Sequence, residues 1–267
     1  MRRKHKGSVV VSIGLFATLA YGQTVIISVT GARPLDQAAE QFEARYGIPV
    51  SYEDATYVYK GDLVDKTHPD YAKSHPDGPR ALFPKGGTLV LRGDPNLPFY
   101  VAPGNAAMPL LKSLLDAHVK AGIPGEFKVI PNGDGLDIVP VAVKDVAGIL
   151  SPDQSPLETK ISLPELKRTG DETLNEICKA ILASSGKKVG VGSSPFMGVQ
   201  SIPPYSVKIG ATNEPARSVL QRSLPILKYY DSRTMGHIPK MAWSLLYDPG
   251  QKIFALNVRY ALFEVFR

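Results

Sequence analysis

The chain has 267 residues, of which 43% are hydrophobic and 21% are charged, and these fractions are typical of a globular protein rather than a disordered one. The formal net charge is +6, but residues 1–22 hold four of the 31 Lys and Arg side chains and no acidic one, so the rest of the chain carries a net charge of only +2. No segment after residue 22 has a basic stripe interleaved with aromatic residues. Composition and charge therefore exclude a nucleic-acid-binding protein.

Residues 1–22 have the pattern of a secretory signal peptide. A basic start is followed by the apolar stretch Val9–Leu19, and Ala20-Tyr21-Gly22 is a small-x-small cleavage site. The alternative is an uncleaved anchor over Val9–Val29, which is long enough to cross a bilayer but is interrupted by Gln23. We expect cleavage before Gln23, export to the periplasm or cell envelope, and no membrane span in the mature protein.

Residues 25–54 predict a strand, an amphipathic helix and a second strand. Val25–Val29 is rich in β-branched residues, and Pro34 is suited to the first position of a helix. Gly47 is suited to its left-handed end, and Ile48–Tyr52 then returns to extended structure. The apolar face of this helix is formed by Leu35, Ala38, Ala39, Phe42 and Tyr46. The opposite, solvent-facing side is expected to hold Asp36, Gln37, Glu40, Gln41, Glu43 and Arg45.

Residues 57–103 form a long irregular stretch, which we interpret as an insertion, although residues 86–93 within it predict a strand. The tyrosines before and inside this stretch are candidate binding residues, because aromatic rings stack on sugars; tyrosines that simply cover a sheet are the alternative. These residues are Tyr52, Tyr57, Tyr59 and Tyr71.

Within this stretch the tripeptide His-Pro-Asp occurs twice, seven residues apart. The two copies supply His68, Asp70, His75 and Asp77 as possible metal ligands. Pro-Asp is also ordinary turn chemistry, and a flexible loop holds ligands poorly. We therefore favour a solvated loop and expect no metal and no cofactor.

After the insertion, Asn105 is a plausible N-cap of a second helix that ends at Gly122, and its apolar residues are Met108, Leu111, Leu114, Leu115 and Val119. Phe127–Ile130 and Leu136–Val139 flank an Asn-Gly step, which predicts a β-hairpin. Residues 146–159 are rich in Ser-Pro and Pro-Asp steps, and we interpret them as a linker.

The second part of the chain repeats this order of elements. A strand at Lys160–Leu163 precedes a helix with a capping box formed by Thr169 and Glu172. Strands, a further helix opening at 213–215 and a closing hairpin follow. The stripe of the capped helix contains Leu174, Ile177, Cys178, Ile181 and Leu182, and the lone cysteine is interpreted as a small buried hydrophobe.

The residues Pro34, Leu35, Ala38, Ala39, Phe42, Tyr46, Gly47, Val50 and Tyr52 carry a resemblance. Their pattern resembles the short N-terminal (STN) domain of secretins and TonB-dependent transducers, and the C-terminal domain of FecR-like regulators. A looser match in the second half includes Thr173, Leu174, Ile177, Gly186, Val189 and Val191. The resemblance implies two modules with helices packed on small sheets, and a role in binding proteins. The chain departs from these families in its long insertion and in lacking a receptor barrel, a secretin core or a FecR-type membrane helix.

Enzyme motifs are weak. Two Ser-x-x-Lys matches, Ser184 with Lys187 and Ser185 with Lys188, lie at a helix end, whereas a catalytic pair of this kind needs the serine at a helix start. Acidic residues between positions 53 and 65, namely Glu53, Asp54, Asp62 and Asp65, are candidates for carboxylate-based hydrolysis of a glycan or peptide. Acidic turns and strand ends are the alternative interpretation.

The sequence thus predicts an α+β protein made of two duplicated β-α-β-β-α-β-β modules. The expected division is a signal peptide over 1–22, a first module over 23–145 with its insertion, a linker over 146–159 and a second module over 160–267. The expected function is non-catalytic binding of another envelope protein. The alternatives are an envelope hydrolase and a structural domain of an envelope assembly.

Overall fold

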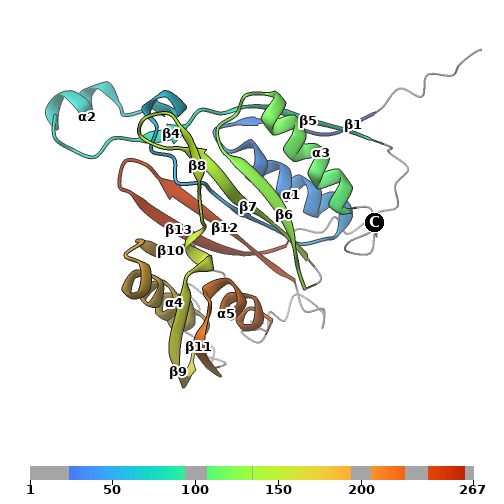
Figure 1. Ribbon diagram of the computed structural model, residues 1–267, viewed down its shortest axis with the longest axis vertical. Helices are drawn as coiled ribbons and strands as arrows, with labels where there is room; N and C mark the ends of the chain where they lie inside the picture. The colour runs from blue at the N-terminus through green and yellow to red at the C-terminus, as the bar shows by residue number, and fades with distance from the viewer. Residues whose placement is uncertain (1–23, 94–106, 134, 194–205, 226–239, 262–267) are drawn as a thin grey trace, which may run out of the picture.

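The computed structural model describes residues 24–93, 107–133, 135–193, 206–225 and 240–261. The predicted signal peptide and Asn105 lie outside these ranges, as does Leu227, the last apolar residue expected in the helix that opens at 213–215. The protein has an α+β fold, with helices packed on both faces of one sheet (Figure 1). No helix in the described ranges is long and apolar enough to cross a membrane.

The described residues of the first half, which lie within 24–144, include two principal helices and five principal strands. The helices are α1 (Pro34–Tyr46) and α3 (Ala107–Lys120). The strands are β1 (Thr24–Gly31), β2 (Val50–Glu53), β5 (Gly87–Gly93), β6 (Glu126–Asn132) and β7 (Gly135–Lys144). Gly47 ends α1 with a φ of 64°, the left-handed conformation that the sequence predicts.

An excursion between β2 and β5 contains short elements: η1 (Lys60–Asp62), β3 (Leu63–Asp65), α2 (Pro69–Ser74) and β4 (Leu82–Pro84). The stretch interpreted as a solvated loop thus includes the short helix α2, none of whose residues is buried. Strand β5 lies within the range 57–103 but belongs to the core, because Leu89 and Leu91 are buried there. The excursion from the fold is therefore shorter than the interpreted insertion and ends before β5.

The second half, residues 160–260, repeats these elements as β9 (Lys160–Arg168), α4 (Gly170–Ser185), β10 (Val189–Ser193), β11 (Val207–Pro215), α5 (Ala216–Ser223), β12 (Met241–Asp248) and β13 (Ile253–Tyr260). Thr169 and Glu172 form the predicted capping box at the start of α4. Gly186 ends this helix with a φ of 71°.

One sheet joins the two halves. Its strands follow the order β10-β13-β12-β2-β7-β6, and β12 of the second half pairs in parallel with β2 of the first. Strand β8 (Leu150–Pro152) also pairs with β7. In each half, the first strand pairs separately with the strand before the second helix, as the antiparallel ribbons β1–β5 and β9–β11.

The segment interpreted as a linker is folded. Besides β8 it contains η2 (Pro156–Glu158), where Leu157 is fully buried in the core of the second half. Ser155 caps this turn by accepting a hydrogen bond of 3.0 Å from the backbone N–H of Leu157. Residues 146–159 therefore connect the halves through packed structure, and the halves share a continuous sheet rather than standing apart as separate modules.

The helices of the two halves lie on opposite faces of this sheet (Figure 1). Along β12, Trp243, Leu245 and Tyr247 pack with α4 and α5. Leu246 packs on the other face with the core formed by α1 and α3. Successive side chains of a strand point to opposite faces, so β12 contributes to both cores.

The predicted helix faces are mostly right and are wrong at three positions. Leu182, expected in the apolar stripe, is 47% exposed, and Val119 is 59% exposed. Glu43, expected on the solvent face of α1, is fully buried. Glu43 accepts a hydrogen bond of 2.8 Å from the N–H of Val50 and pairs with Arg259. A partner from the second half thus explains its burial.

Candidate functional site

The most concentrated charged group in the described residues lies where the two halves meet. Arg217, the second residue of α5, donates to Glu53 on β2 over 2.9 Å and to Asp137 on β7 over 3.0 Å. Its Nε donates to Glu158 of η2 over 2.9 Å. The indole N–H of Trp243 also donates to Glu53, over 3.1 Å. We call Arg217, Glu53, Asp137, Glu158 and Trp243 the Arg217 network.

Local structure explains how these side chains meet. Glu53 is the last residue of β2, and Tyr52 beside it faces α1 and α3, so the carboxylate of Glu53 faces α5. Asp137 on the neighbouring strand β7 pairs with Ser51, which lies two residues before Glu53 and therefore on the same face of the sheet. The carboxyl groups of Asp137 and Glu53 thus lie on one face. Helix α5 begins directly after β11 and places Arg217 in its first turn above both carboxylates.

The network is buried and its charges perturb one another. Burial raises the pKa of Asp137 to about 6; the neighbouring Glu53 adds to the increase, and Arg217 opposes it. Burial disfavours the charge on Arg217, yet Glu53 and Asp137 raise its pKa above the usual value. One guanidinium thus faces three carboxyl groups.

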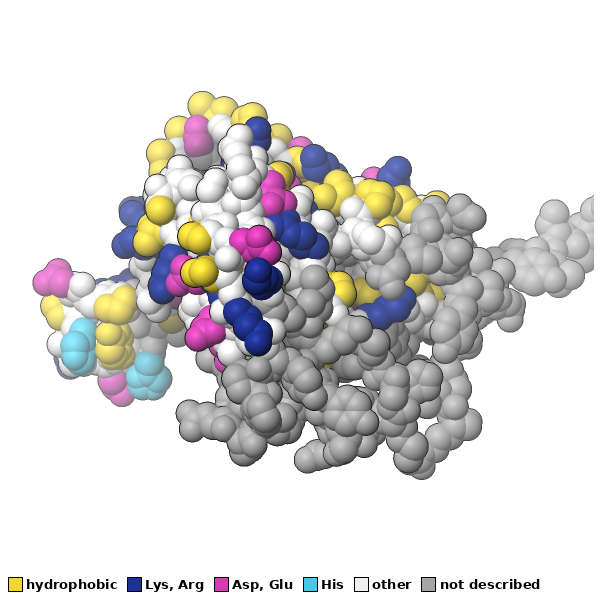
Figure 2. Space-filling model, turned by 90° about the horizontal axis from the view of Figure 1, so that it is seen from below, with side chains coloured by type: hydrophobic (Ala, Val, Ile, Leu, Met, Phe, Trp, Pro, Cys, Tyr) yellow, Lys and Arg dark blue, Asp and Glu magenta, His cyan; other side chains and the backbone are white. Residues whose placement is uncertain are grey.

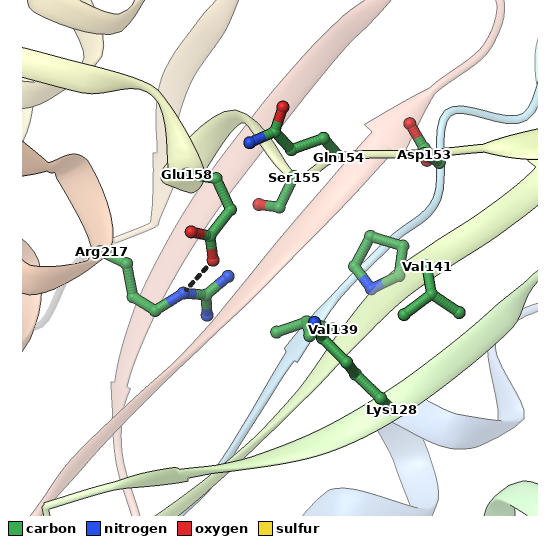
Figure 3. A pocket seen from close by; sticks show the side chains of 9 residues that line it. Lys128, Val139, Val141, Asp153, Gln154, Ser155, Glu158 and Arg217 are labelled. Atoms are coloured by element: carbon green, nitrogen blue, oxygen red, sulfur yellow. Dashed lines mark hydrogen bonds and ion pairs between the residues drawn. The ribbon is translucent and has the colours of Figure 1, made fainter.

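A hollow of about 330 Å³ opens beside the network on the same face of the sheet (Figure 3). Strands β6 and β7 form its floor, and the segment from β8 to η2 forms one wall. Its lining residues are Lys128, Val139, Pro140, Val141, Asp153, Gln154, Ser155, Glu158 and Arg217. In Figure 3, Arg217 and Glu158 face each other across one end, and Val139 and Val141 lie on the floor. The hollow combines an apolar floor with charges of both signs at its margins.

A second buried group lies on the opposite face. Asp54 accepts hydrogen bonds from Arg33 over 2.6 Å, from the hydroxyl of Tyr52 over 2.7 Å and from the N–H of Tyr247 over 2.9 Å. Burial raises the pKa of Asp54, and its bond with Arg33 opposes the increase. This group ties β2 to the end of β12, so it also joins the two halves.

The acidic residues considered for hydrolysis do not converge. Glu53 ends β2 and Asp54 follows it; their side chains point to opposite sides of the sheet, are fully buried and are both held by partners. Asp62 pairs with Lys144 over 3.2 Å, and Asp65 accepts from the N–H of Thr67. A pair of carboxyl groups flanking a substrate must share an open cleft, and these residues do not.

The tyrosines proposed as binding residues are dispersed. Tyr52 and Tyr57 are buried in the core, so their expected role as an exposed stacking surface is wrong. Tyr59 lies beneath Lys144, whose ammonium group is 5.4 Å from the ring centre. Tyr71 is 39% exposed on α2, where its ring stacks on His75 with centres 4.6 Å apart.

The two histidines of the excursion have local structural roles, and Asp70 and Asp77 are exposed. His68 caps α2 by accepting a hydrogen bond of 3.3 Å from the N–H of Asp70, and His75 stacks on Tyr71. The described residues contain no group of three or more His, Cys, Asp or Glu side chains placed to bind a metal ion. Figure 2 shows the histidines on the projecting α2 segment, and Lys and Arg interspersed with Asp and Glu over the coloured part of this face.

Sequence reasoning did not find Arg217, Asp137 or Glu158. Arg217 had a detectable signal, because this arginine follows Ala216 at a position that the helical pattern turns toward the sheet. Asp137 sits in an otherwise apolar strand, Leu136 to Val139, and an acidic residue inside such a strand signals a buried partner. Nothing near Glu158 in the sequence identifies its partner.

Comparisons with protein-family models, with curated proteins and with solved structures give no match for this chain.

Proposed function

We propose that this protein is a non-catalytic interaction module that binds another polypeptide by adding a strand to the edge of its sheet. The observation that carries the proposal is the pair of outer strands, β6 and β10. Within the described part of the chain, each of them pairs on one side only, β6 with β7 and β10 with β13. Unpaired edge strands present backbone donors and acceptors that an extended polypeptide satisfies.

The outward groups of β10 follow from its pairing. The C=O of Lys188 accepts a hydrogen bond from the N–H of Phe254 on β13, so residues 188, 190 and 192 direct their backbone groups toward β13. Val189 and Val191 alternate with these residues and direct their backbone N–H and C=O groups outward, away from β13. The two glycines of this strand, Gly190 and Gly192, leave one of its faces without side chains, which allows close approach of a partner.

The buried charges favour binding over catalysis. The carboxylates of Glu53 and Asp54 are each held by an arginine and by further donors, which is the arrangement of a structural network. A general acid or base needs a route to substrate, and the partners of these two groups occupy that position. The resemblance to STN and FecR modules also supports an interaction role.

Substitution of the outward edge tests the proposal. Val191→Pro removes an outward N–H and keeps the β13 ladder, because proline is tolerated at edge positions whose N–H faces away from the sheet. A photoreactive residue at Ser193 should cross-link the parent protein to a polypeptide in cells, and Val191→Pro should abolish the adduct. Leu166→Glu, on β9 and 55% exposed, is the matched control and should keep the adduct. An adduct that survives Val191→Pro unchanged would contradict strand addition at this edge.

We also propose that the protein is exported, on the basis of the signal-like residues 1–22. N-terminal sequencing of the protein recovered from envelope fractions should begin at Gln23. An intact Met1 in a membrane fraction would instead support an anchor.

A further inference from the structure

We propose that the polypeptide bound at the β10 edge is a second copy of this chain, paired through its β6 edge, so that chains assemble head to tail into an open filament with a continuous sheet. The proposal rests on the proposed strand addition and names its partner. It follows from the junction that already exists inside the chain between β12 and β2.

Each half presents the same three strands to the shared sheet. In the first half, β2 pairs in parallel with β7, and β7 pairs antiparallel with β6. In the second half, β10 pairs in parallel with β13, and β13 pairs antiparallel with β12. The registers of the two parallel pairs also match. Val50 pairs with Leu136 and Tyr52 with Ile138 in the first half. With the same two-residue spacing, Val189 pairs with Phe254 and Val191 with Leu256 in the second half. Strand β10 therefore corresponds to β2, and β6 corresponds to β12.

The two halves are related by a half-turn combined with a shift along the rotation axis. This axis lies in the plane of the sheet and is perpendicular to the strands. The strand order has the same sense in both halves, whereas β10 and β13 run opposite to β2 and β7. The helices also change face (Figure 1). Repeating this operation places another β10 beside β6, in parallel, as β2 lies beside β12. Because the operation includes a shift, the assembly does not close.

The backbone of β6 is compatible with this pairing. The internal junction uses two residues of β12, Ser244 and Leu245, which pair with β2. Their counterparts on β6 are Lys128 and Val129. Pro131 corresponds to Tyr247, whose N–H binds the side chain of Asp54 and not a backbone carbonyl. The missing N–H of Pro131 therefore removes no ladder bond at the outer junction.

The charges of the internal junction are replaced at the outer edges by apolar or small residues. Ala107 and Ala216 are the buried first residues of α3 and α5, so Met108 corresponds to Arg217. Gly192 corresponds to Glu53, and Phe127 corresponds to Trp243. Pairing of β6 with the β10 of another copy thus brings Met108 and Phe127 near Gly192 of that copy. Met108 and Gly192 are uncharged, so this junction does not bury the charges that Arg217 and Glu53 bring to the internal one.

The exposed Leu182 and the hollow provide a second, independent fit. Leu182 of α4 corresponds to Glu43 of α1, because the carbonyl of each accepts a hydrogen bond from the backbone N–H of the glycine that ends its helix, Gly186 and Gly47 respectively. Glu43 contacts Arg259 on β13, whose counterpart on β7 is Val141. The half-turn therefore places Leu182, 47% exposed, over Val141 on the floor of the hollow beside Lys128 (Figure 3). An apolar side chain that is unexplained in the single chain thus meets an apolar floor in the next copy.

Sedimentation and light scattering of the purified full chain over a range of concentrations test the assembly. The parent should form species longer than dimers, and electron microscopy should show a rise of about 29 Å per chain, because six strands at about 4.8 Å separate equivalent positions. Leu182→Glu blocks one edge and Val141→Lys blocks the other, so each variant alone should be monomeric. Leu166→Glu, on β9, which pairs with β11 outside the shared sheet, should assemble as the parent does.

Mixing the two blocked variants distinguishes a head-to-tail interface from a symmetric one. The mixture should assemble beyond dimers although neither variant assembles alone, because native β6–β10 junctions alternate there with junctions of opposite charge. The double variant Leu182→Glu/Val141→Lys should recover assembly for the same reason. If Val141→Lys fails to fold by circular dichroism, Val129→Pro replaces it as the block on β6. A parent that stays monomeric at all concentrations, or assembly that survives Leu182→Glu, would overturn the proposal. A monomeric parent that still forms the Ser193 adduct with a different polypeptide would overturn only the identity of the partner and leave strand addition standing.

Discussion

Arg217 is the residue whose removal should cost most, because it neutralises two buried carboxylates, Glu53 and Asp137. Arg217→Met keeps the aliphatic bulk and leaves those carboxylates without their cation. Breaking a buried ion pair by removing one partner costs roughly 3–5 kcal/mol, and chemical denaturation measures the loss. Arg222→Ala, on the same helix but in a half-exposed pair with Glu214, should change stability by less than about 1 kcal/mol. Equal losses in the two variants would show that the buried network contributes no more than a surface pair.

Asp137 should make stability depend on pH. Its pKa is about 6 in the folded protein against an ordinary 3.8, so the folded state holds the proton more tightly than the unfolded chain does. Stability from this group is therefore fully present below about pH 4 and is lost as the pH rises to about 6. The shift of about two units corresponds to about 3 kcal/mol.

The variant Asp137→Asn removes this titration and preserves the shape of the side chain. Between pH 4 and 6 the parent should lose stability relative to the variant, as urea denaturation at a series of pH values will measure. Burial also raises the pKa of Asp36 to about 6, but that group titrates in both proteins and cancels from the difference. Parallel stability curves for the two proteins would contradict the raised pKa of Asp137.

At the scale of elements, α4 is the helix with the clearest division between buried and exposed faces. Ile177 is fully buried and Leu182 is 47% exposed. Ile177→Ala should cost about 2–5 kcal/mol, because it removes buried atoms and leaves a cavity. Leu182→Ala should stay within about 0.5 kcal/mol in the monomer. Thr169→Ala, which removes only the cap, should cost about 1 kcal/mol. Thermal denaturation measures all three, and an unchanged melting temperature in Ile177→Ala would contradict the packing of α4 on the sheet.

Helix and strand boundaries follow from local chemistry, and this is why many of them could be predicted. Gly47 and Gly186 end helices in the left-handed conformation that glycine adopts most readily, and Thr169 with Glu172 starts α4. Faces were harder to predict. Glu43 and Leu182 occupy corresponding positions of α1 and α4, and the predictions for both were wrong. Glu43 is buried because Arg259, distant in the sequence, pairs with it, whereas no distant segment of the described residues covers Leu182.

At the scale of the whole molecule, the shared sheet predicts that the two halves unfold together. Strands β2 and β12 are interior to the sheet, and Glu53 and Asp54 depend on partners in the second half. Fluorescence of Trp243, the single tryptophan, reports the junction. Hydrogen exchange of α1 reports the first half.

Both signals should change at the same denaturant concentration, and Arg217→Met should move them together. If the first half instead keeps its protection from exchange after the tryptophan signal has changed, the halves are independent domains and the junction contributes little to either.

The sequence by itself determined the order of the principal elements, the end of α1, both ends of α4, the hairpins and the α+β class, because each depends on residues within a few positions of one another. Only the tertiary structure decided that β12 pairs with β2, that residues 146–159 are folded, and that Arg217 meets Glu53 and Asp137. The physical reason is that the backbone of almost every residue offers the same hydrogen-bond donor and acceptor at a strand edge. The local sequence pattern of a strand therefore does not predict which strand will pair with it. That choice depends on which buried charges and apolar faces fit across the junction.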